Sequence, residues 1–273
     1  MRFLILFVWV SLAAAARPAD AEQSAPLIIG DTFSVESKAI GEKRRINVYL
    51  PPGYAEAADK RFPVLYMPDG GIAEDFLHVA GLVQVGVGNG TMRPFILVGI
   101  ENTERRRDMT GPTENAEDKK IAPRVGGSEA FRKFVRSELM PEVQGRYRTT
   151  DESAVVGESL AGLWVVETFL LEHELFDTYI AFDPSLWWNT QHLVKAAGEA
   201  LPKHAKLEKT LYIATSGEGT PELAERFVES LNKSAAGGIR VTYEKMPEEK
   251  HATIYHPAAL KAFRALFKPA PDK

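Results

Sequence analysis

The sequence has no cysteine among its 273 residues, which excludes disulfide bonds, a thiol nucleophile and a lipid-modified N-terminal cysteine. It also lacks any long block of like charge: the net charge is −4 and the pI about 5.9, so we expect no nucleic-acid partner. No histidines and carboxylates have a metal-ligand spacing such as H-E-x-x-H, so neither a metal nor another cofactor is expected. The absence of internal repeats and low-complexity linkers favours a single domain.

An apolar run is present at the N-terminus. Arg2 precedes apolar residues 3–16, and Ala19-Asp20-Ala21 has the small-x-small pattern of a cleavage site. We predict a signal peptide at 1–21, with cleavage after Ala16 as the second choice, and one domain at 22–273. A retained anchor is the alternative, although the run is short for a span of about 20 residues. The mature protein is then expected in the periplasm or outside the cell, without stable membrane association.

The pattern of apolar residues predicts an α/β fold. Segments 32–37 and 45–50 alternate apolar with polar residues, which indicates an antiparallel pair at a sheet edge. Continuous apolar runs predict buried strands, and helix-length segments separate most of them, so we expect a mostly parallel sheet with helices on both faces. The buried strands are expected at 63–67, 95–100, 154–156, 179–182, 211–214 and 241–243, and helices at 73–83, 129–144, 190–200, 221–233, 257–267 and directly after 159.

Ser159 lies where the apolar run 154–156 gives way to helical periodicity. Gly157 precedes it by two residues, and this strand–turn–helix context is typical of the G-x-S-x-G elbow that carries a nucleophilic serine. Ala161 replaces the last glycine of the pattern, and Gly162 follows one place later. One added methyl group should leave the turn intact. The alternative is a serine that only caps the helix.

A serine hydroxyl needs a base, and His251 is the best placed of six histidines. It follows the strand at 241–243 and lies downstream of Ser159, in the chain order nucleophile, acid, base. The other five lie on or beside predicted helices, where solvated or packed histidines are common; they are His78, His173, His192, His204 and His256.

The carboxylate that orients the imidazole should follow the strand at 211–214, where the loop reads SGEGTPEL. Pro221 predicts a helix start that places Glu222 in the first turn. We favour Glu222 over Glu218, and Glu158 beside the serine is a third candidate. Glu222 would otherwise simply complement the helix dipole.

Two backbone N–H groups are candidates for an oxyanion hole. Leu160 opens the helix behind the serine, and Gly71 lies in the Asp-Gly-Gly turn after the strand at 63–67. An ordinary Asp-Gly turn is the alternative for Gly71.

Four further side chains are candidates for substrate binding. Arg105 and Arg107 follow the strand at 95–100 and place a positive cluster on a loop that faces the site, unless they pair with nearby carboxylates to fix the loop. Trp187 and Trp188 follow the strand at 179–182 and either line an aromatic or acyl pocket or belong to the core.

Over residues 30–268 the chain resembles the putative-esterase branch of the α/β-hydrolase superfamily, which includes siderophore (enterobactin-type) esterases, formylglutathione hydrolase-like enzymes and mycolyl-transferring relatives. The resemblance rests on VYLPPGY (48–54), VLYMPDGG (64–71), VGIENTERRRDMT (98–110), SELMPEV (137–143), VVGESLAG (155–162), FDPSLWW (182–188) and HATIYHPAAL (251–260). It implies Ser159 as nucleophile, His251 as base, Gly71 as oxyanion donor and an acid near Glu222. Glu158 stands where many relatives have His or Gln.

The sequence therefore predicts a secreted serine ester hydrolase that uses a Ser159–His251–Glu222 triad and an acyl-enzyme, with a small-molecule ester as substrate. Siderophore-type or other polar or aromatic acyl esters suit the arginines and tryptophans. An acyltransferase of the mycolyl-transferring kind and a non-catalytic binding protein are the alternatives. The sequence leaves the individual ester and the oligomeric state open.

Overall fold

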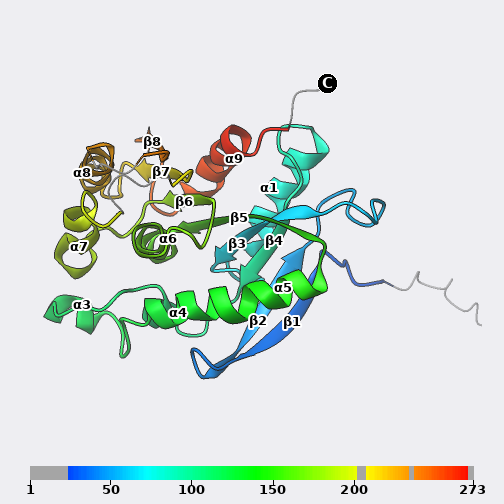
Figure 1. Ribbon diagram of the computed structural model, residues 1–273, viewed down its shortest axis with the longest axis horizontal. Helices are drawn as coiled ribbons and strands as arrows, with labels where there is room; N and C mark the ends of the chain where they lie inside the picture. Colours follow the sequence, from blue (N-terminus) through cyan, green and yellow to red (C-terminus); the bar gives the residue numbers. More distant parts are fainter. Residues whose placement is uncertain (1–23, 202–206, 234–236, 270–273) are drawn as a thin grey trace, which may run out of the picture.

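One eight-stranded sheet forms the centre of the fold (Figure 1). The computed structural model describes residues 24–201, 207–233 and 237–269. The strands are β1 Asp31–Ser37, β2 Glu42–Tyr49, β3 Phe62–Pro68, β4 Ile96–Ile100, β5 Thr149–Glu158, β6 Thr178–Phe182, β7 Thr210–Ser216 and β8 Arg240–Met246. Their spatial order is β1-β2-β4-β3-β5-β6-β7-β8. β2 pairs antiparallel with β1 and β4, and the remaining pairs are parallel, as predicted.

Helices cover both faces of this sheet. They are α1 Phe76–Gly88, α2 Arg105–Asp108, α3 Ala116–Lys120, α4 Ser128–Phe134, the π-helical turn η1 Val135–Leu139, α5 Met140–Arg146, α6 Leu160–Leu171, α7 Trp188–Ala196, α8 Pro221–Asn232 and α9 Tyr255–Leu266. α1 and α9 lie together on one face, and α4, α5 and α6 lie on the other (Figure 1).

Alternation along the strands explains these two layers. Leu65 and Met67 of β3 pack in the cluster that includes α1 and α9, whereas Val64 and Tyr66 pack in the cluster on the opposite face. All seven residues of β3 are buried, because successive side chains point to opposite faces and both faces are covered. Continuous apolar runs in the sequence therefore mark the central strands.

The predicted signal peptide at 1–21 lies outside the described residues. Among residues 24–201, 207–233 and 237–269, no helix has both the length and the apolar character needed to cross a bilayer.

The turn from β5 to α6 has a rare backbone conformation at Ser159, with φ 61° and ψ −117°. A non-glycine residue held in such a region costs on the order of 1–3 kcal/mol. Two hydrogen bonds support the turn: Ser159 N–H donates to the Phe182 carbonyl at 3.0 Å, and Ser185 N–H donates to the Ser159 carbonyl at 3.1 Å. The turn is thus joined to the end of β6.

Two glycines allow this close approach. A Cβ at Gly157 would lie 2.7 Å from the carbonyl carbon of Ala161, and one at Gly162 would lie 3.0 Å from the Phe182 carbonyl oxygen. Alanine is accommodated at 161 because the facing Gly157 carries no side chain. The shifted glycine at 162 lets α6 pack directly on the end of β6.

We therefore expect Gly157→Ala to lower the free energy of unfolding by about 1–3 kcal/mol, because the new methyl group meets backbone atoms that cannot rotate away. Urea unfolding of the purified protein measures this change. Gly81→Ala in α1 is the matched control, since a Cβ there meets nothing within 4 Å. Equal stability of the two variants would contradict the packing argument.

Candidate active site

Ser159 and His251 meet at the carboxyl edge of the sheet. His251 Nε2 lies 3.2 Å from Ser159 Oγ, although 92 residues separate them in the chain. Ser159 comes from the turn after β5, and His251 from the loop between β8 and α9. The His251 side chain is about half exposed, at 46%. The structure therefore brings together the two residues that the sequence predicted as nucleophile and base.

Asp183 occupies the other side of the imidazole. Its Oδ2 lies 3.0 Å from His251 Nδ1, and its side chain is fully buried. Ser216, the last residue of β7, donates its backbone N–H to Oδ1 at 2.7 Å and its hydroxyl to Oδ2 at 2.5 Å. Burial opposes ionisation of Asp183, but the hydrogen bonds from His251 and Ser216 outweigh it and hold its pKa below the usual range.

This contact sets the protonation of the imidazole. An ionised carboxylate can only accept, so Nδ1 carries the proton, and in the neutral ring Nε2 is left free to accept from Ser159. The hydrogen bond to Asp183 is the main cause of a raised His251 pKa, with a further contribution from Glu158. The chain Asp183–His251–Ser159 has the geometry of a serine hydrolase triad.

The acids favoured from the sequence are not the partners of His251. Among the hydrogen bonds and ion pairs of the described residues, none joins His251 to Glu222 or Glu218. Glu222 is exposed in the first turn of α8, and Glu218 is exposed and pairs with Lys250 at 3.9 Å. β6 pairs directly with β5, and the Ser159 N–H donates to the Phe182 carbonyl, so the first residue after β6 lies beside the serine turn.

A sequence signal for Asp183 existed. Asp183 directly follows the buried strand 178–182, the class of position from which catalytic groups project in a parallel sheet. It also lies within the FDPSLWW segment. The chain order of an α/β-hydrolase favours an acid after the strand at 211–214, and therefore Glu222.

The two predicted oxyanion donors differ in their surroundings. Leu160 is the first residue of α6, where a backbone N–H has no acceptor within the helix. The N–H of Gly71 donates to Glu74 Oε2 at 2.7 Å. Glu74 also accepts from the N–H of Asn102, at 3.3 Å. The Gly71 N–H is thus occupied by the Glu74 carboxylate, and its role as an oxyanion donor stays a prediction.

The tryptophan pair divides between the site and the core. Trp187 is 41% exposed and lines a cavity of about 270 Å³ together with Ser159, Asp183 and His251. Trp188 is buried, and its indole N–H donates to the Gly111 carbonyl at 2.9 Å. Of the two, Trp187 alone lines this cavity, and Trp188 packs in the core.

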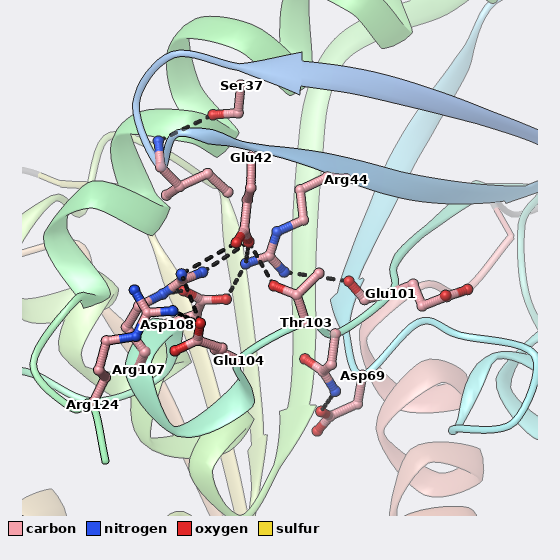
Figure 2. A network of polar contacts seen from close by, with 12 residues as sticks. Ser37, Glu42, Arg44, Asp69, Glu101, Thr103, Glu104, Arg107, Asp108 and Arg124 are labelled. Atoms are coloured by element: carbon pink, nitrogen blue, oxygen red, sulfur yellow. Dashed lines mark hydrogen bonds and ion pairs between the residues drawn. The ribbon is translucent and has the colours of Figure 1, made fainter. Parts of the chain in front are cut away.

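Arg107 belongs to a buried ionic network rather than to a free surface (Figure 2). It donates to Glu42 at 2.8 Å and to Asp108 at 2.6 Å, and Arg44 pairs with both of these carboxylates. Burial raises the pKa of Glu42, but hydrogen bonds from Arg107 and Thr103 lower it to about 2. Only 14% of the Arg107 side chain is exposed, so its main contacts hold the loop in place.

Arg105 stands closer to the serine. It makes two parallel hydrogen bonds to Asp69, at 2.7 and 2.8 Å, and its side chain remains 34% exposed. Arg105 and Arg107 line a groove of about 570 Å³ with Arg106, Arg124 and Glu104, so cationic side chains outnumber carboxylates in its lining. In the described part of the chain, no group of three or more histidines and carboxylates could hold a metal ion.

Comparison with known proteins identifies relatives over most of this chain. A family model described as "Putative esterase" matches residues 37–257. The chain is 25% identical over 256 residues to the ferri-bacillibactin esterase BesA of Bacillus subtilis, covering 84% of this chain and 86% of that protein. It is 29% identical over 188 residues to a siderophore triacetylfusarinine C esterase of Aspergillus fumigatus, covering 60% of this chain and 59% of that one.

Solved structures share the fold. An IroE-like serine hydrolase from Shewanella oneidensis matches with a TM-score of 0.74 and 29% identity, over 87% of this chain and 80% of its own. The BES protein of Bacillus cereus matches with a TM-score of 0.74 and 20% identity, over 93% of this chain and 100% of its own. The predicted α/β-hydrolase fold is confirmed.

We expect Asp183→Asn to lower the pKa of His251, because the hydrogen bond from Nδ1 to the carboxylate favours the charged imidazolium. Titration of the histidine ring protons by NMR measures this shift, with His251→Gln used to assign the signal. Glu222→Gln is the control and should leave the pKa of His251 unchanged. The opposite pattern would return the orienting role to Glu222.

Proposed function

The chain belongs to the "Putative esterase" family and is a carboxylic ester hydrolase, and from this premise we propose that Ser159, His251 and Asp183 form its catalytic triad. The observation that carries the proposal is the continuous hydrogen-bonded chain from buried Asp183 through His251 to Ser159. In this proposal Asp183 takes the role that the sequence predicts for Glu222.

The reaction begins with attack by Ser159 Oγ on the ester carbonyl, while His251 Nε2 accepts the hydroxyl proton. In the imidazolium that forms, the Nδ1–H still donates to the carboxylate of Asp183, whose lowered pKa keeps it ionised near neutral pH. The negative charge on the former carbonyl oxygen is stabilised by the Leu160 N–H at the start of α6. Rotation of the Glu74 side chain frees the Gly71 N–H as a second donor.

Collapse of the tetrahedral intermediate breaks the bond to the alcohol oxygen, which takes the proton from His251 Nε2 and leaves an acyl group on Ser159. Water then enters and gives its proton to His251 as it attacks the acyl carbon. Return of that proton to Ser159 releases the carboxylic acid. Atoms and charges balance over the cycle, with water as the only co-reactant.

The lining of the site favours a polar or aromatic acyl ester of the siderophore type. Trp187 offers an exposed aromatic face in the cavity that Ser159 also lines. Four arginines, Arg105 among them, line a separate groove. Several relatives are named as siderophore esterases. A ferric catecholate ester, with aromatic rings and a net negative charge, matches both surfaces.

Export is part of the same proposal. The pattern at residues 1–21 is that of a cleaved signal peptide, which would place one mature domain, residues 22–273, in the periplasm or outside the cell. An N-terminal sequence of the mature protein beginning at Glu22 would support this part.

We expect Ser159→Ala to reduce kcat/KM for p-nitrophenyl acetate by about 10⁴-fold or more, because the nucleophile is lost while binding remains. The purified mature protein is assayed spectrophotometrically, and a fluorophosphonate probe tests whether Ser159 is labelled. Ser137→Ala, outside the cavity, is the control and should behave as wild type. Unchanged hydrolysis by Ser159→Ala would refute the triad.

We expect Arg106→Ala to raise KM for a ferric catecholate triester about five- to tenfold while leaving p-nitrophenyl acetate hydrolysis unchanged, because a charge-assisted contact contributes roughly 1–1.5 kcal/mol. Arg106 is exposed in the groove, and among the described hydrogen bonds its guanidinium donates to the Ile121 carbonyl. Arg264→Ala on α9, outside the groove, is the control. Equal effects on both substrates would exclude the groove as an anion subsite.

A further inference from the structure

A second carboxylate lies at the same nitrogen of His251 that Asp183 engages. Glu158 Oε1 is 3.5 Å from His251 Nδ1, against 3.0 Å for Asp183 Oδ2. The Glu158 side chain is 16% exposed, so water screens its charge much less than at the surface. Glu158 is the last residue of β5 and directly precedes Ser159, so the nucleophile turn itself fixes its position.

We propose that Glu158 is a positioning residue that shares the Nδ1 side of His251 with Asp183 and supplies a second negative charge to the imidazolium. This rests on the proposed function, because the imidazolium forms when His251 accepts the serine proton. Asp183 provides the hydrogen bond, whereas Glu158 acts through its charge across 3.5 Å. The proton transferred in the reaction stays on Nε2, and Glu158 neither gains nor loses one in the cycle.

Several charged groups face Glu158 and set its ionisation. Burial raises its pKa to about 7; Asp75 and Asp183 add to this increase, while His251 and Arg105 oppose it. Arg105 also donates to the Glu158 backbone carbonyl at 3.4 Å and holds Asp69 on its other side. The buried phenol of Tyr255 lies in the same field, and its raised pKa keeps it neutral.

The consequence is that the second charge varies with pH. The pKa of Glu158, raised to about 7, means that its negative charge increases gradually as the pH rises through neutrality, whereas the lowered pKa of Asp183 keeps that carboxylate ionised over the same range. Glu158 and His251 lie close enough to affect each other's protonation, so the pH profile reports the behaviour of this pair rather than of either residue alone. A second consequence is that Glu158 can partly replace Asp183. If the Asp183 carboxylate is removed, a small movement lets Glu158 accept the hydrogen bond from His251 Nδ1.

The first test is the pKa of His251 in the full-length mature protein, measured by NMR titration of its ring protons. Glu158 lies 3.5 Å from Nδ1 and favours the charged imidazolium, so Glu158→Gln should lower this pKa measurably. Glu222→Gln is the matched control and should leave it unchanged. This readout does not depend on turnover, so it remains valid even if the esterase proposal fails.

The second test is the pH profile of kcat/KM for p-nitrophenyl acetate. The base must be neutral to accept the serine proton, so a lower His251 pKa in Glu158→Gln moves the acidic limb to lower pH by the same amount. The plateau should fall by up to about tenfold, since one pKa unit corresponds to a factor of ten in stabilising the imidazolium. A lower plateau with an unmoved limb and unmoved pKa indicates a structural role and overturns the proposal.

The third test measures the sharing of Nδ1 with a double-mutant cycle. Glu158→Gln should reduce kcat/KM more strongly in an Asp183→Ala background than in wild type, because Glu158 then carries the imidazolium alone. Equal fold-losses in the two backgrounds contradict the sharing of Nδ1. Thermal unfolding measures whether each variant is folded. If Glu158→Gln does not fold, Glu158→Met is the second neutral replacement. An unshifted His251 pKa in Glu158→Met also refutes the proposal.

Discussion

The bend at Ser159 is the constraint on which the rest of the site depends. Its left-handed backbone is possible because Gly157 and Gly162 leave room for α6 to pack against β5 and β6. The same bend exchanges backbone hydrogen bonds with Phe182 and Ser185, which flank Asp183. The turn that presents Ser159 is therefore also joined to the segment that carries Asp183.

Electrostatic balance around His251 follows from this arrangement. Asp183 is fully buried, and its charge is tolerated because Ser216 donates to it twice and the imidazole donates once. Glu158 brings a second carboxylate to the ring, and the guanidinium of Arg105 lies behind it and limits the accumulation of negative charge. A half-exposed imidazole between these groups can gain and lose a proton near neutral pH.

The three consecutive arginines of α2 have three different environments. Arg107 points into the ionic network with Glu42 and Asp108 and stabilises the loop. Arg105 is held by Asp69 close to the nucleophile turn. Arg106 is exposed in the groove. One short helix thus links a structural network, the electrostatics of the site and a surface suited to anionic ligands.

The sheet and the positions of Ser159 and His251 could be predicted from the sequence, because both depend on local signals. Runs of apolar residues indicate buried strands, a glycine-flanked serine between strand and helix indicates an elbow, and a histidine in the last loop has the required chain order. Asp183 could not be chosen over Glu222 or Glu218, since all three follow strands whose carboxyl ends meet at one edge. The order of strands in space placed Asp183 against the imidazole, and packing directed Trp187 outward and Trp188 inward. Such choices depend on contacts between residues far apart in the chain, and no local pattern records those distances.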